Sequence, residues 1–442
     1  MTKKGLIFIK TSKYTLFFPD INGGNKQIMY NSLTSSLALI DDDHFGQYLA
    51  FKDENITIKD EKFYKDLKRG GFIIDEKIDE LELIRHDMYK AKFNSNQISL
   101  TIAPTLECNF GCIYCFEKEV VNKRKMSKET ADYIIEFIKE KSKIIKSLNV
   151  YWYGGEPLLA IDMINYLSSK IIEICKKNNI AYLSSIITNG YLLTDSNIES
   201  LIKSNISMIQ VTVDGDRETH NKRRPLKGGG ASFDTIISNL KSIKKYGLSA
   251  QLRINIDEEN GAESYKIVDI LKDMDLLENV FPYLAPVKNY DNCYLDEKCI
   301  SSYDYLNMKK RFNDYIKAGG FKSIAEGDNL PRRINSVCTA DKANDLVIGA
   351  DGELYKCWTD IGKEELSIGN IKSGICENLI YFNYIMTDPT FDLKCKECSY
   401  LPICLSGCPN DRKNKEINLC PEVFKNTENA IYNIVKDYNI DI

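Results

Sequence analysis

From about residue 98 the chain alternates short apolar, β-branched runs with longer amphipathic segments. The short runs predict six strands, at 98–103, 149–153, 182–188, 208–213, 250–256 and 280–284. The amphipathic segments predict helices between them, near 128–142, 160–177, 195–203, 233–246 and 262–274. Strands that alternate with crossover helices run parallel to one another. We therefore predict an α/β fold with a partial (β/α)6 TIM-like barrel rather than a complete barrel of eight.

The first 95 residues have a different pattern, which predicts a small α+β domain. Short β-like runs lie at 6–9, 14–18 and 27–30. Helix-like segments follow near 32–39, 45–51 and 61–68, the last ending at the stop signal Gly70-Gly71. This order of strands and helices fits a winged-helix-like fold for residues 1–95.

After about residue 300 the regular alternation ends. One helix is predicted at 303–317, and one hairpin with strands at 346–348 and 354–358 around Asp351-Gly352. The rest has little apolar periodicity but holds eight cysteines from Cys338 to Cys420, so we expect ligation to stabilise it. The chain thus divides into 1–95, a barrel at 96–300, and a bridging and cysteine-rich region at 301–442.

Composition and charge narrow the functional classes. The 442 residues carry 63 acidic and 59 basic side chains, and a net charge of −4 argues against a dedicated nucleic-acid binder. No apolar run approaches the roughly 20 residues that span a bilayer. The first apolar run, at 6–9, is too short for a signal-peptide core. We expect a cytoplasmic protein without nucleic acid or membrane as partner.

The fourteen cysteines gather at two places, and only Cys175 lies between Cys115 and Cys293. A secreted disulfide scaffold would be short and evenly bridged, so metal coordination is favoured over disulfides. Cys175, on a helical pattern, is expected to be a small core residue.

The first thiol cluster follows the first predicted barrel strand. Cys108, Cys112 and Cys115 form a C-x3-C-x2-C triplet on one loop. Three thiolates can bind three irons of a [4Fe-4S] cluster and leave the fourth iron without a protein ligand. A zinc site is the alternative, although zinc prefers four protein ligands and the three histidines of the chain lie elsewhere in the sequence.

A second motif, Gly154-Gly155-Glu156-Pro157, ends the second predicted strand. Two glycines allow close approach to the backbone, and a carboxylate there could hold an ammonium group. An ordinary tight turn between strand and helix is the alternative.

Together these features resemble the radical S-adenosylmethionine (SAM) enzymes, in which an aromatic residue, here Tyr114, precedes the last cysteine. The resemblance covers about 98–290. It implies that the cysteine triplet holds a [4Fe-4S] cluster whose open iron chelates the amino and carboxyl groups of SAM. The SAM contacts that it implies are Tyr114, Gly154, Gly155, Glu156, Asn189, Thr212 and Arg224. The stretch 216–224 resembles the family's continuation around His220, with a solvated charged loop as the alternative.

The second thiol cluster resembles the SPASM domain of peptide-modifying radical SAM enzymes, which has seven cysteines in this order. Zinc knuckles are the alternative. The resemblance implies one auxiliary [4Fe-4S] cluster on Cys395, Cys398, Cys404 and Cys420, and another on Cys338, Cys357 and Cys408. Sulfatase-maturating enzymes have a further cysteine after the first, and 339–352 has none. The second auxiliary cluster is therefore expected to have an open iron or to recruit Cys293, Cys299 or Cys376.

The residue after Cys357 also departs from sulfatase-maturating enzymes, which have a catalytic Asp there. Here the residue is Trp358, and Asp360, two positions on, is the candidate for proton transfer.

The resemblance implies an enzyme that uses SAM and three [4Fe-4S] clusters to make a 5′-deoxyadenosyl radical. We expect it to abstract hydrogen from a ribosomally made precursor peptide and to install a thioether or carbon–carbon cross-link. Residues 1–95 would bind the leader of that peptide at a sheet edge or, alternatively, cap the barrel, and a flavodoxin- or ferredoxin-type donor would supply electrons. Oxidation of a Cys or Ser side chain as in sulfatase maturation, action on a small molecule, and a non-enzymatic iron–sulfur electron carrier are the alternatives.

Overall fold

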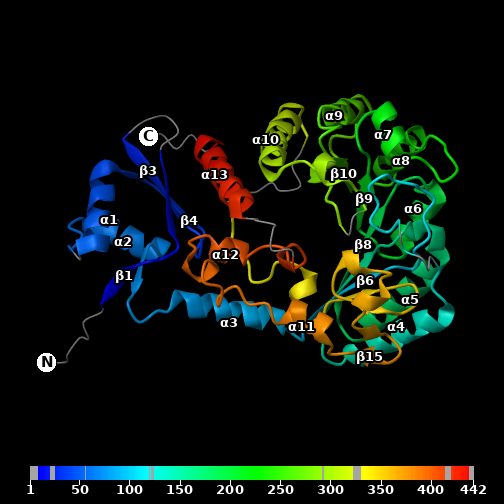
Figure 1. Cartoon of the computed structure of the whole chain (residues 1–442), viewed down its shortest axis with the longest axis horizontal. Helices are drawn as coiled ribbons and strands as arrows, with labels where there is room; N and C mark the ends of the chain where they lie inside the picture. The colour runs from blue at the N-terminus through cyan, green and yellow to red at the C-terminus, as the bar shows by residue number, and fades with distance from the viewer. Residues whose placement is uncertain are drawn as a thin grey trace. The chain divides into compact units, whose positions relative to one another are not determined.

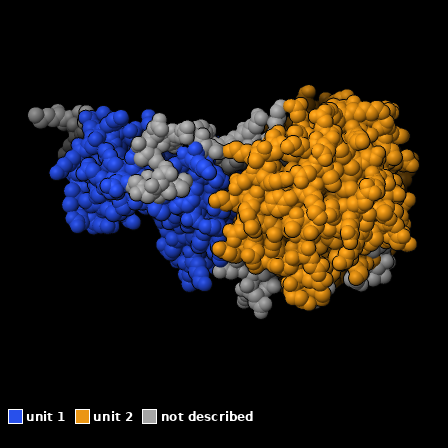
Figure 2. All heavy atoms as spheres, turned by 90° about the horizontal axis from the view of Figure 1, so that it is seen from above, with its two compact units in different colours: residues 1–93, 327–341, 386–442 blue, residues 94–326, 342–385 orange. Residues whose placement is uncertain are grey.

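The computed structural model describes residues 8–19, 25–54, 56–118, 120, 124–290, 293–321, 330–413 and 420–437. The chain forms two compact units, which Figure 2 shows in different colours. Unit 1 comprises residues 1–93, 327–341 and 386–442, and unit 2 comprises residues 94–326 and 342–385. The functional division at residues 95 and 300 stays a prediction.

Unit 2 is built on an eight-stranded, largely parallel sheet of order β11-β10-β9-β8-β7-β6-β12-β13. The strands are β6 Gln97–Ile102, β7 Ser147–Trp152, β8 Ala181–Thr188, β9 Met208–Thr212, β10 Ala250–Ile256, β11 Val280–Pro286, β12 Leu346–Ile348 and β13 Leu354–Tyr355. Strands β6 to β11 pair in parallel with their neighbours, and β12 adds in parallel to β6. The six predicted strands and the partial-barrel fold class are thereby confirmed.

Helices follow these strands as predicted: α4 Lys128–Lys141, α5 Ile161–Lys177, α6 Asp195–Lys203, α8 Phe233–Lys245 and α9 Ser264–Asp273. Figure 1 shows them around the outside of the strands. They cover the apolar face of the sheet, where Leu100, Val150 and Val211 are buried. Cys175 is buried in this core, as predicted.

The other face of the sheet is polar. Asn149 Nδ2 of β7 donates to Ser99 Oγ of the neighbouring β6 at 3.4 Å. Tyr283 Oη of β11 donates to Gln210 Oε1 of β9 at 2.8 Å, although these two strands are not adjacent in the sheet. Side chains alternate between the two faces along each strand, so the same strands that form the core also present polar groups to the interior of the barrel.

The rest of unit 2 contains α10 Ser302–Ala318, the short strands β14 Gly369–Asn370 and β15 Gly374–Ile375, and α11 Leu379–Ile385. The predicted helix at 303–317 and the predicted hairpin are confirmed, with β12 antiparallel to β13, but the second strand ends at Tyr355 rather than at 358. Gly352 has φ = 86°, a left-handed conformation that suits glycine in the hairpin turn. Across both units, none of the described helices combines the length and the apolarity that crossing a bilayer requires.

Unit 1 combines the first part of the chain with its last part. Its strands are β1 Ile9–Thr11, β2 Thr15–Pro19, β3 Lys26–Asn31, β4 Ser36–Asp41 and β5 Ile73–Asp75, and its helices are α1 Asp42–Glu54, α2 Glu61–Gly70, α3 Glu80–Lys92, α12 Leu401–Cys404 and α13 Cys420–Asp437. The sheet β2-β3-β4 is antiparallel. Helix α13 packs against it through Ile431 and Val435, which contact Phe18, Ile28 and Tyr30.

The helix predicted at 32–39 is wrong, because this stretch is a turn followed by strand β4. Asn31 Oδ1 accepts hydrogen bonds from the backbone N–H of Leu33 at 2.9 Å and of Thr34 at 3.0 Å, which closes the turn. Ser35 then takes φ = 58°, and Ser36 pairs with Asn31 as the hairpin begins. The local side-chain bond thus outweighs the helical spacing of the apolar residues.

Candidate active site

The cysteine loop follows β6 and is held by backbone hydrogen bonds to the end of α7 Arg217–Arg223 and to the segment after it. Gly111 N–H donates to Pro225 O at 2.8 Å, and Lys227 N–H donates to Asn109 O at 2.8 Å. Ile113 N–H donates to Arg223 O at 3.1 Å. The loop that carries Cys108, Cys112 and Cys115 is therefore positioned by main-chain contacts on the barrel.

The glycines after β7 lie directly against the connection that leads into this loop. Gly155 N–H donates to Thr105 O at 3.2 Å, and Glu156 N–H donates to Glu107 O at 2.8 Å. A Cβ atom on Gly155 would lie 2.2 Å from Glu107 O. Gly154, at φ = 112°, would place a Cβ atom 2.4 Å from Thr105 O. Both positions require glycine because two backbones meet there.

Glu156 is fully buried and binds the end of the next strand. Its Oε1 accepts hydrogen bonds from Thr188 Oγ1 at 2.7 Å and from Leu158 N–H at 3.0 Å, and its Oε2 accepts one from Asn189 N–H at 2.7 Å. Burial raises the pKa of Glu156, and the three donors act in the opposite direction. These bonds use three of the roughly four acceptor positions of a carboxylate.

Asn189 connects this carboxylate to the cysteine loop. Its side-chain Nδ2 donates to Asn109 Oδ1 at 2.8 Å and lies 3.9 Å from Cys108 Sγ. Its Oδ1 accepts from Tyr191 N–H at 3.0 Å. Asn189 therefore lies beside the first thiol, and Thr212 is buried at the end of β9.

Tyr114, between the last two cysteines, is the centre of a polar network. Its hydroxyl donates to Asp214 Oδ2 and accepts hydrogen bonds from Arg224 Nη1 at 2.7 Å and Asn255 Nδ2 at 3.0 Å. Asp214 is fully buried, and burial raises the pKa of Tyr114 well above its usual range. The network ties the cysteine loop to the ends of β9 and β10.

The network continues through residues that were not predicted as site residues. Arg223 Nη1 donates to Asp257 Oδ2 at 2.5 Å, and Arg223 Nε lies 3.4 Å from Asp214 Oδ2. Tyr294 Oη donates to Asp257 at 2.7 Å. Asn255 and Asp257 lie at the C-terminal end of a predicted strand, and barrel enzymes place their functional groups at such ends, so this signal was present in the sequence.

The alternative interpretation of 216–224, a solvated charged loop, is wrong, because the segment forms α7 and buries His220, Arg223 and Arg224. His220 Nδ1 accepts from Asp214 N–H at 3.2 Å, which assigns the proton to Nε2. Nε2 lies 3.1 Å from Ser232 Oγ, and that hydroxyl donates to Arg224 O at 2.8 Å. His220 thus positions the backbone of Arg224.

Two arginine nitrogens in this network suit an anionic ligand. Arg224 Nε and Arg223 Nη2 are buried and have no hydrogen-bond partner among the residues that the structure describes. A buried, unsatisfied donor is costly unless a ligand pairs with it. Arg224 also lies near Cys112, whose charge acts on its guanidinium. Three thiols with an adjacent unsatisfied guanidinium fit a [4Fe-4S] cluster and the carboxylate of SAM.

Within the described ranges, no group of three His, Cys, Asp or Glu side chains converges on a point where one metal ion could bind. A [4Fe-4S] cluster does not require such convergence, because each thiolate binds a different iron. Burial raises the pKa of Cys108 to about 11 and that of Cys115 to about 12, and each of the two thiols lies within electrostatic range of Cys112.

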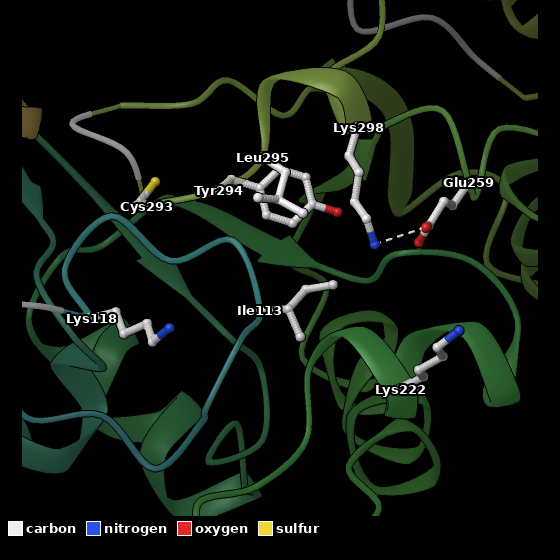
Figure 3. A pocket seen from close by; sticks show the side chains of 8 residues that line it. All are labelled: Ile113, Lys118, Lys222, Glu259, Cys293, Tyr294, Leu295 and Lys298. Carbon is white, nitrogen blue, oxygen red and sulfur yellow. Dashed lines mark ion pairs between the residues drawn. The ribbon is translucent and has the colours of Figure 1, made fainter.

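A cavity of about 510 Å³ adjoins the cysteine loop. Figure 3 shows Ile113 of the loop between Lys118 and Lys222, with the ion pair of Lys298 and Glu259 above them. Cys293 also lines this cavity, and its thiol donates to Tyr114 O at 3.7 Å. Cys293 therefore lies beside the first thiol cluster.

Trp358 and Asp360 have different surroundings in unit 2. The indole packs on Tyr153, with ring centroids 4.8 Å apart, and on Tyr151 at 6.3 Å. Asp360 is buried, and its Oδ2 accepts a hydrogen bond from Tyr384 Oη at 2.8 Å. Cys357 Sγ lies 3.1 Å from Thr359 Oγ1. Position 358 therefore contributes to an aromatic cluster at the end of β7, while Asp360 is enclosed.

The other C-terminal cysteines belong to unit 1. Cys395 and Cys404 both lie within electrostatic range of Cys420, and Cys404 also of Cys398. These four thiols are the ones predicted for one auxiliary cluster, and that assignment stays a prediction. Cys338 and Cys408 lie near Arg412 in the same unit, whereas Cys357 belongs to unit 2.

Comparison with known proteins agrees with this geometry. Residues 102–270 match the model of the radical SAM superfamily. Over 350 residues the chain is 27% identical to a cysteine-type anaerobic sulfatase-maturating enzyme of Clostridium novyi (strain NT), and the match covers 73% of this chain and 89% of that enzyme.

Two solved structures share the fold. The structure of anSMEcpe with bound AdoMet has a TM-score of 0.62 and 21% identity, and covers 78% of this chain and 96% of its own. Streptococcus suis SuiB bound to precursor peptide SuiA has a TM-score of 0.54 and 17% identity, and covers 92% of this chain and 97% of its own. The chain therefore contains a radical SAM domain at residues 102–270 and is homologous to the anaerobic sulfatase-maturating enzymes.

Proposed function

We propose that this enzyme modifies a ribosomally made precursor peptide by installing a thioether or carbon–carbon cross-link. The observation that carries the proposal is the fold likeness to SuiB, a protein solved with its precursor peptide, over 92% of this chain. That coverage extends into the first 93 residues, which would bind the leader of the peptide. A domain with such a role distinguishes a peptide modifier from an enzyme that acts on a small molecule.

The site residues have defined roles in this proposal. Cys108, Cys112 and Cys115 hold the [4Fe-4S] cluster on a loop fixed by backbone bonds. With SAM bound, such a cluster supplies a 5′-deoxyadenosyl radical that abstracts hydrogen from an unactivated carbon. Arg224 Nε, which is buried and has no partner among the described residues, would pair with the carboxylate of SAM. Glu156 and Asn189 hold the loops around the ligand and limit the access of water.

The sheet β2-β3-β4 of unit 1 is the proposed leader-binding element. One face packs on α13, and Met29 and Ile40 of the other face pack with Tyr48 of α1. With both faces covered, a peptide would add as a strand at an edge, β2 or β4. A flavodoxin- or ferredoxin-type protein would supply the electrons, and the auxiliary clusters would accept the surplus electron after ring closure.

The test is anaerobic incubation with SAM, dithionite and the candidate precursor peptide encoded next to this gene. We expect 5′-deoxyadenosine and a peptide lighter by the mass of two hydrogen atoms, whose joined residues stay linked after proteolysis. Cys112→Ala should abolish both products. A peptide of unchanged mass alongside 5′-deoxyadenosine would contradict the cross-linking proposal and leave the radical SAM chemistry intact.

Oxidation of a Cys or Ser side chain, as in sulfatase maturation, is the second candidate. It is favoured by the 27% identity to a sulfatase-maturating enzyme over 73% of the chain. Against it, Trp358 stacks on Tyr153 at the position where that chemistry expects an Asp, and Asp360 is buried against Tyr384. A hydrazide probe separates the two reactions, because the oxidation leaves a carbonyl group on the peptide and the cross-link does not.

A further inference from the structure

Arg412 lies among the C-terminal cysteines of unit 1 with a hydrogen-bond donor to spare. Its backbone N–H donates to Cys408 O at 3.1 Å, and its Nη1 donates to Ser406 Oγ at 2.7 Å. Its Nε is buried and has no hydrogen-bond partner within the described part of the chain. A guanidinium has five N–H donors and cannot be deprotonated in proteins, so this group requires acceptors.

The charged groups that act on this guanidinium are the Asp341 carboxylate and thiols from both predicted auxiliary sets. Cys338 and Cys408 belong to one set and Cys395 to the other, and all three are within electrostatic range of Arg412. Burial lowers the pKa of Arg412, and the Asp341 carboxylate acts in the opposite direction. Neutral thiols are poor acceptors, whereas cluster-bound thiolates and sulfides accept hydrogen bonds.

Packing brings these segments together independently of charge. Ile334 N–H donates to Pro402 O at 2.9 Å, which joins the segment before Cys338 to α12. Val337 and Cys395 pack against the same apolar cluster, which contains Leu401 and Leu405. These contacts hold Cys395 and the segment before Cys338 against the same apolar cluster of unit 1.

A second buried cation reinforces the positive charge. Lys92, at the end of α3, is 3% exposed, and its Nζ donates to Thr387 O at 2.7 Å. Arg412 and Asp341 are both within its electrostatic range, together with Asp388. Burying cations is costly unless anions pair with them. An iron–sulfur cluster carried by thiolates supplies negative charge where Arg412 has an unused donor.

We propose that Arg412 is a positioning residue for the auxiliary clusters: its Nε–H donates to a sulfur atom of one of them, and its charge raises the reduction potential. A fixed cation stabilises the more negative, reduced state of a cluster more than the oxidised state. Arg412 would thereby make the auxiliary clusters better electron acceptors after ring closure. This inference rests on the auxiliary clusters of the proposed function.

The experiment is a redox titration of the auxiliary clusters, monitored by electron paramagnetic resonance. The full chain with Cys108→Ala, Cys112→Ala and Cys115→Ala is the parent, because it lacks the first cluster and needs neither SAM nor peptide. Arg412→Gln in this parent should shift the auxiliary potential to more negative values. Arg412→Lys keeps the charge and should stay near the parent. Arg69→Gln is the matched control, since that arginine is on the surface with its side chain 83% exposed.

The outcomes separate charge from packing. Unchanged potentials in Arg412→Gln, or equal shifts in the Gln and Lys variants, would overturn the proposal. If Arg412→Gln loses its iron, the Arg412→Lys variant decides the question. Iron retained in Arg412→Lys at the potential of the parent supports the proposal, and loss of iron from Arg412→Lys as well overturns it. If the parent contains no iron, the proposal for Arg412 and the prediction of auxiliary clusters are both wrong. The radical SAM activity is tested separately, by SAM cleavage in the wild-type enzyme.

Discussion

Thr188 Oγ1 donates a hydrogen bond to Glu156 Oε1 at 2.7 Å, and this bond ties the end of β8 to the loop after β7. The same carboxylate accepts from Asn189 N–H, and the Asn189 side chain reaches Asn109 in the cysteine loop. One buried acidic side chain thus fixes two loops of the site relative to the cysteines.

Glu156→Gln should lower the free energy of unfolding by about 1–3 kcal/mol, because the amide N–H₂ would face an N–H or hydroxyl donor and leave buried groups unpaired. Urea unfolding of the variant and the wild type measures the difference. Glu173→Gln is the control, since that side chain is 74% exposed on α5. An equal loss of unfolding free energy in both variants would refute the conclusion that Glu156 fixes the two loops.

Gly155→Ala should prevent the first cluster from assembling. The added Cβ atom would lie 2.2 Å from Glu107 O, so the cysteine loop must move. Iron and sulfide assays of anaerobically purified protein should show that the first cluster is lost while the auxiliary iron is retained. Gly46→Ala is the control because a Cβ atom there meets nothing within 4 Å. Full iron content in Gly155→Ala would show that the loop tolerates displacement.

The six barrel strands could be predicted because each is a short β-branched run with one apolar face on the helices, as for Leu100 and Val150. The strand β4 could not, because its register depends on a hydrogen bond from Leu33 N–H to the Asn31 side chain. Helix α13 was not predicted, although its apolar face contacts the β2-β3-β4 sheet through Ile431.

The sequence motifs located the candidate site, but they did not give the roles of its residues. Spacing placed Cys108, Cys112 and Cys115 on one loop. Glu156 was expected to meet a ligand, and the structure shows that most of its acceptor positions serve protein donors. The place of Asn255 at the end of a predicted strand was a signal, but its partner was not predictable, because its contact with Tyr114 joins positions 141 residues apart in the chain.

Asn255→Ala should weaken SAM binding about fivefold, because it removes one donor to the Tyr114 hydroxyl, worth about 1 kcal/mol. The loop would keep its backbone contacts and therefore its iron. Anaerobic equilibrium dialysis with labelled SAM measures the affinity. Asn178→Ala is the control, since Asn178 Nδ2 donates to Ile174 O, at the end of its own helix, 2.8 Å away. An unchanged affinity of Asn255→Ala for SAM would show that this bond of the Tyr114 network does not contribute to SAM binding.

The free energy of unfolding should decrease as the pH is lowered, because His220 is buried in its neutral form. Burial, with added repulsion from Arg224 and Arg223, holds the pKa of His220 well below the ordinary value of 6.5. Below about pH 6.5 the unfolded chain therefore binds a proton that the folded chain does not, and stability falls by at most about 1.4 kcal/mol per pH unit. Above that pH the His220 side chain is neutral in the folded and in the unfolded chain, so its contribution to the free energy of unfolding is constant.

Urea unfolding between pH 7.5 and pH 5 of wild type and His220→Asn tests this dependence. An amide can accept from Asp214 N–H and donate to Ser232 without titrating, so the stability difference between the two proteins should shrink as the pH falls. His86→Asn is the control: its side chain is 70% exposed, and replacing it should leave the loss at low pH in place. Parallel pH profiles for wild type and His220→Asn would mean that other groups cause the loss. If the stability of the wild type falls more steeply at low pH than that of His220→Asn, the loss is due to the buried imidazole of His220, which supports Arg224 through Ser232.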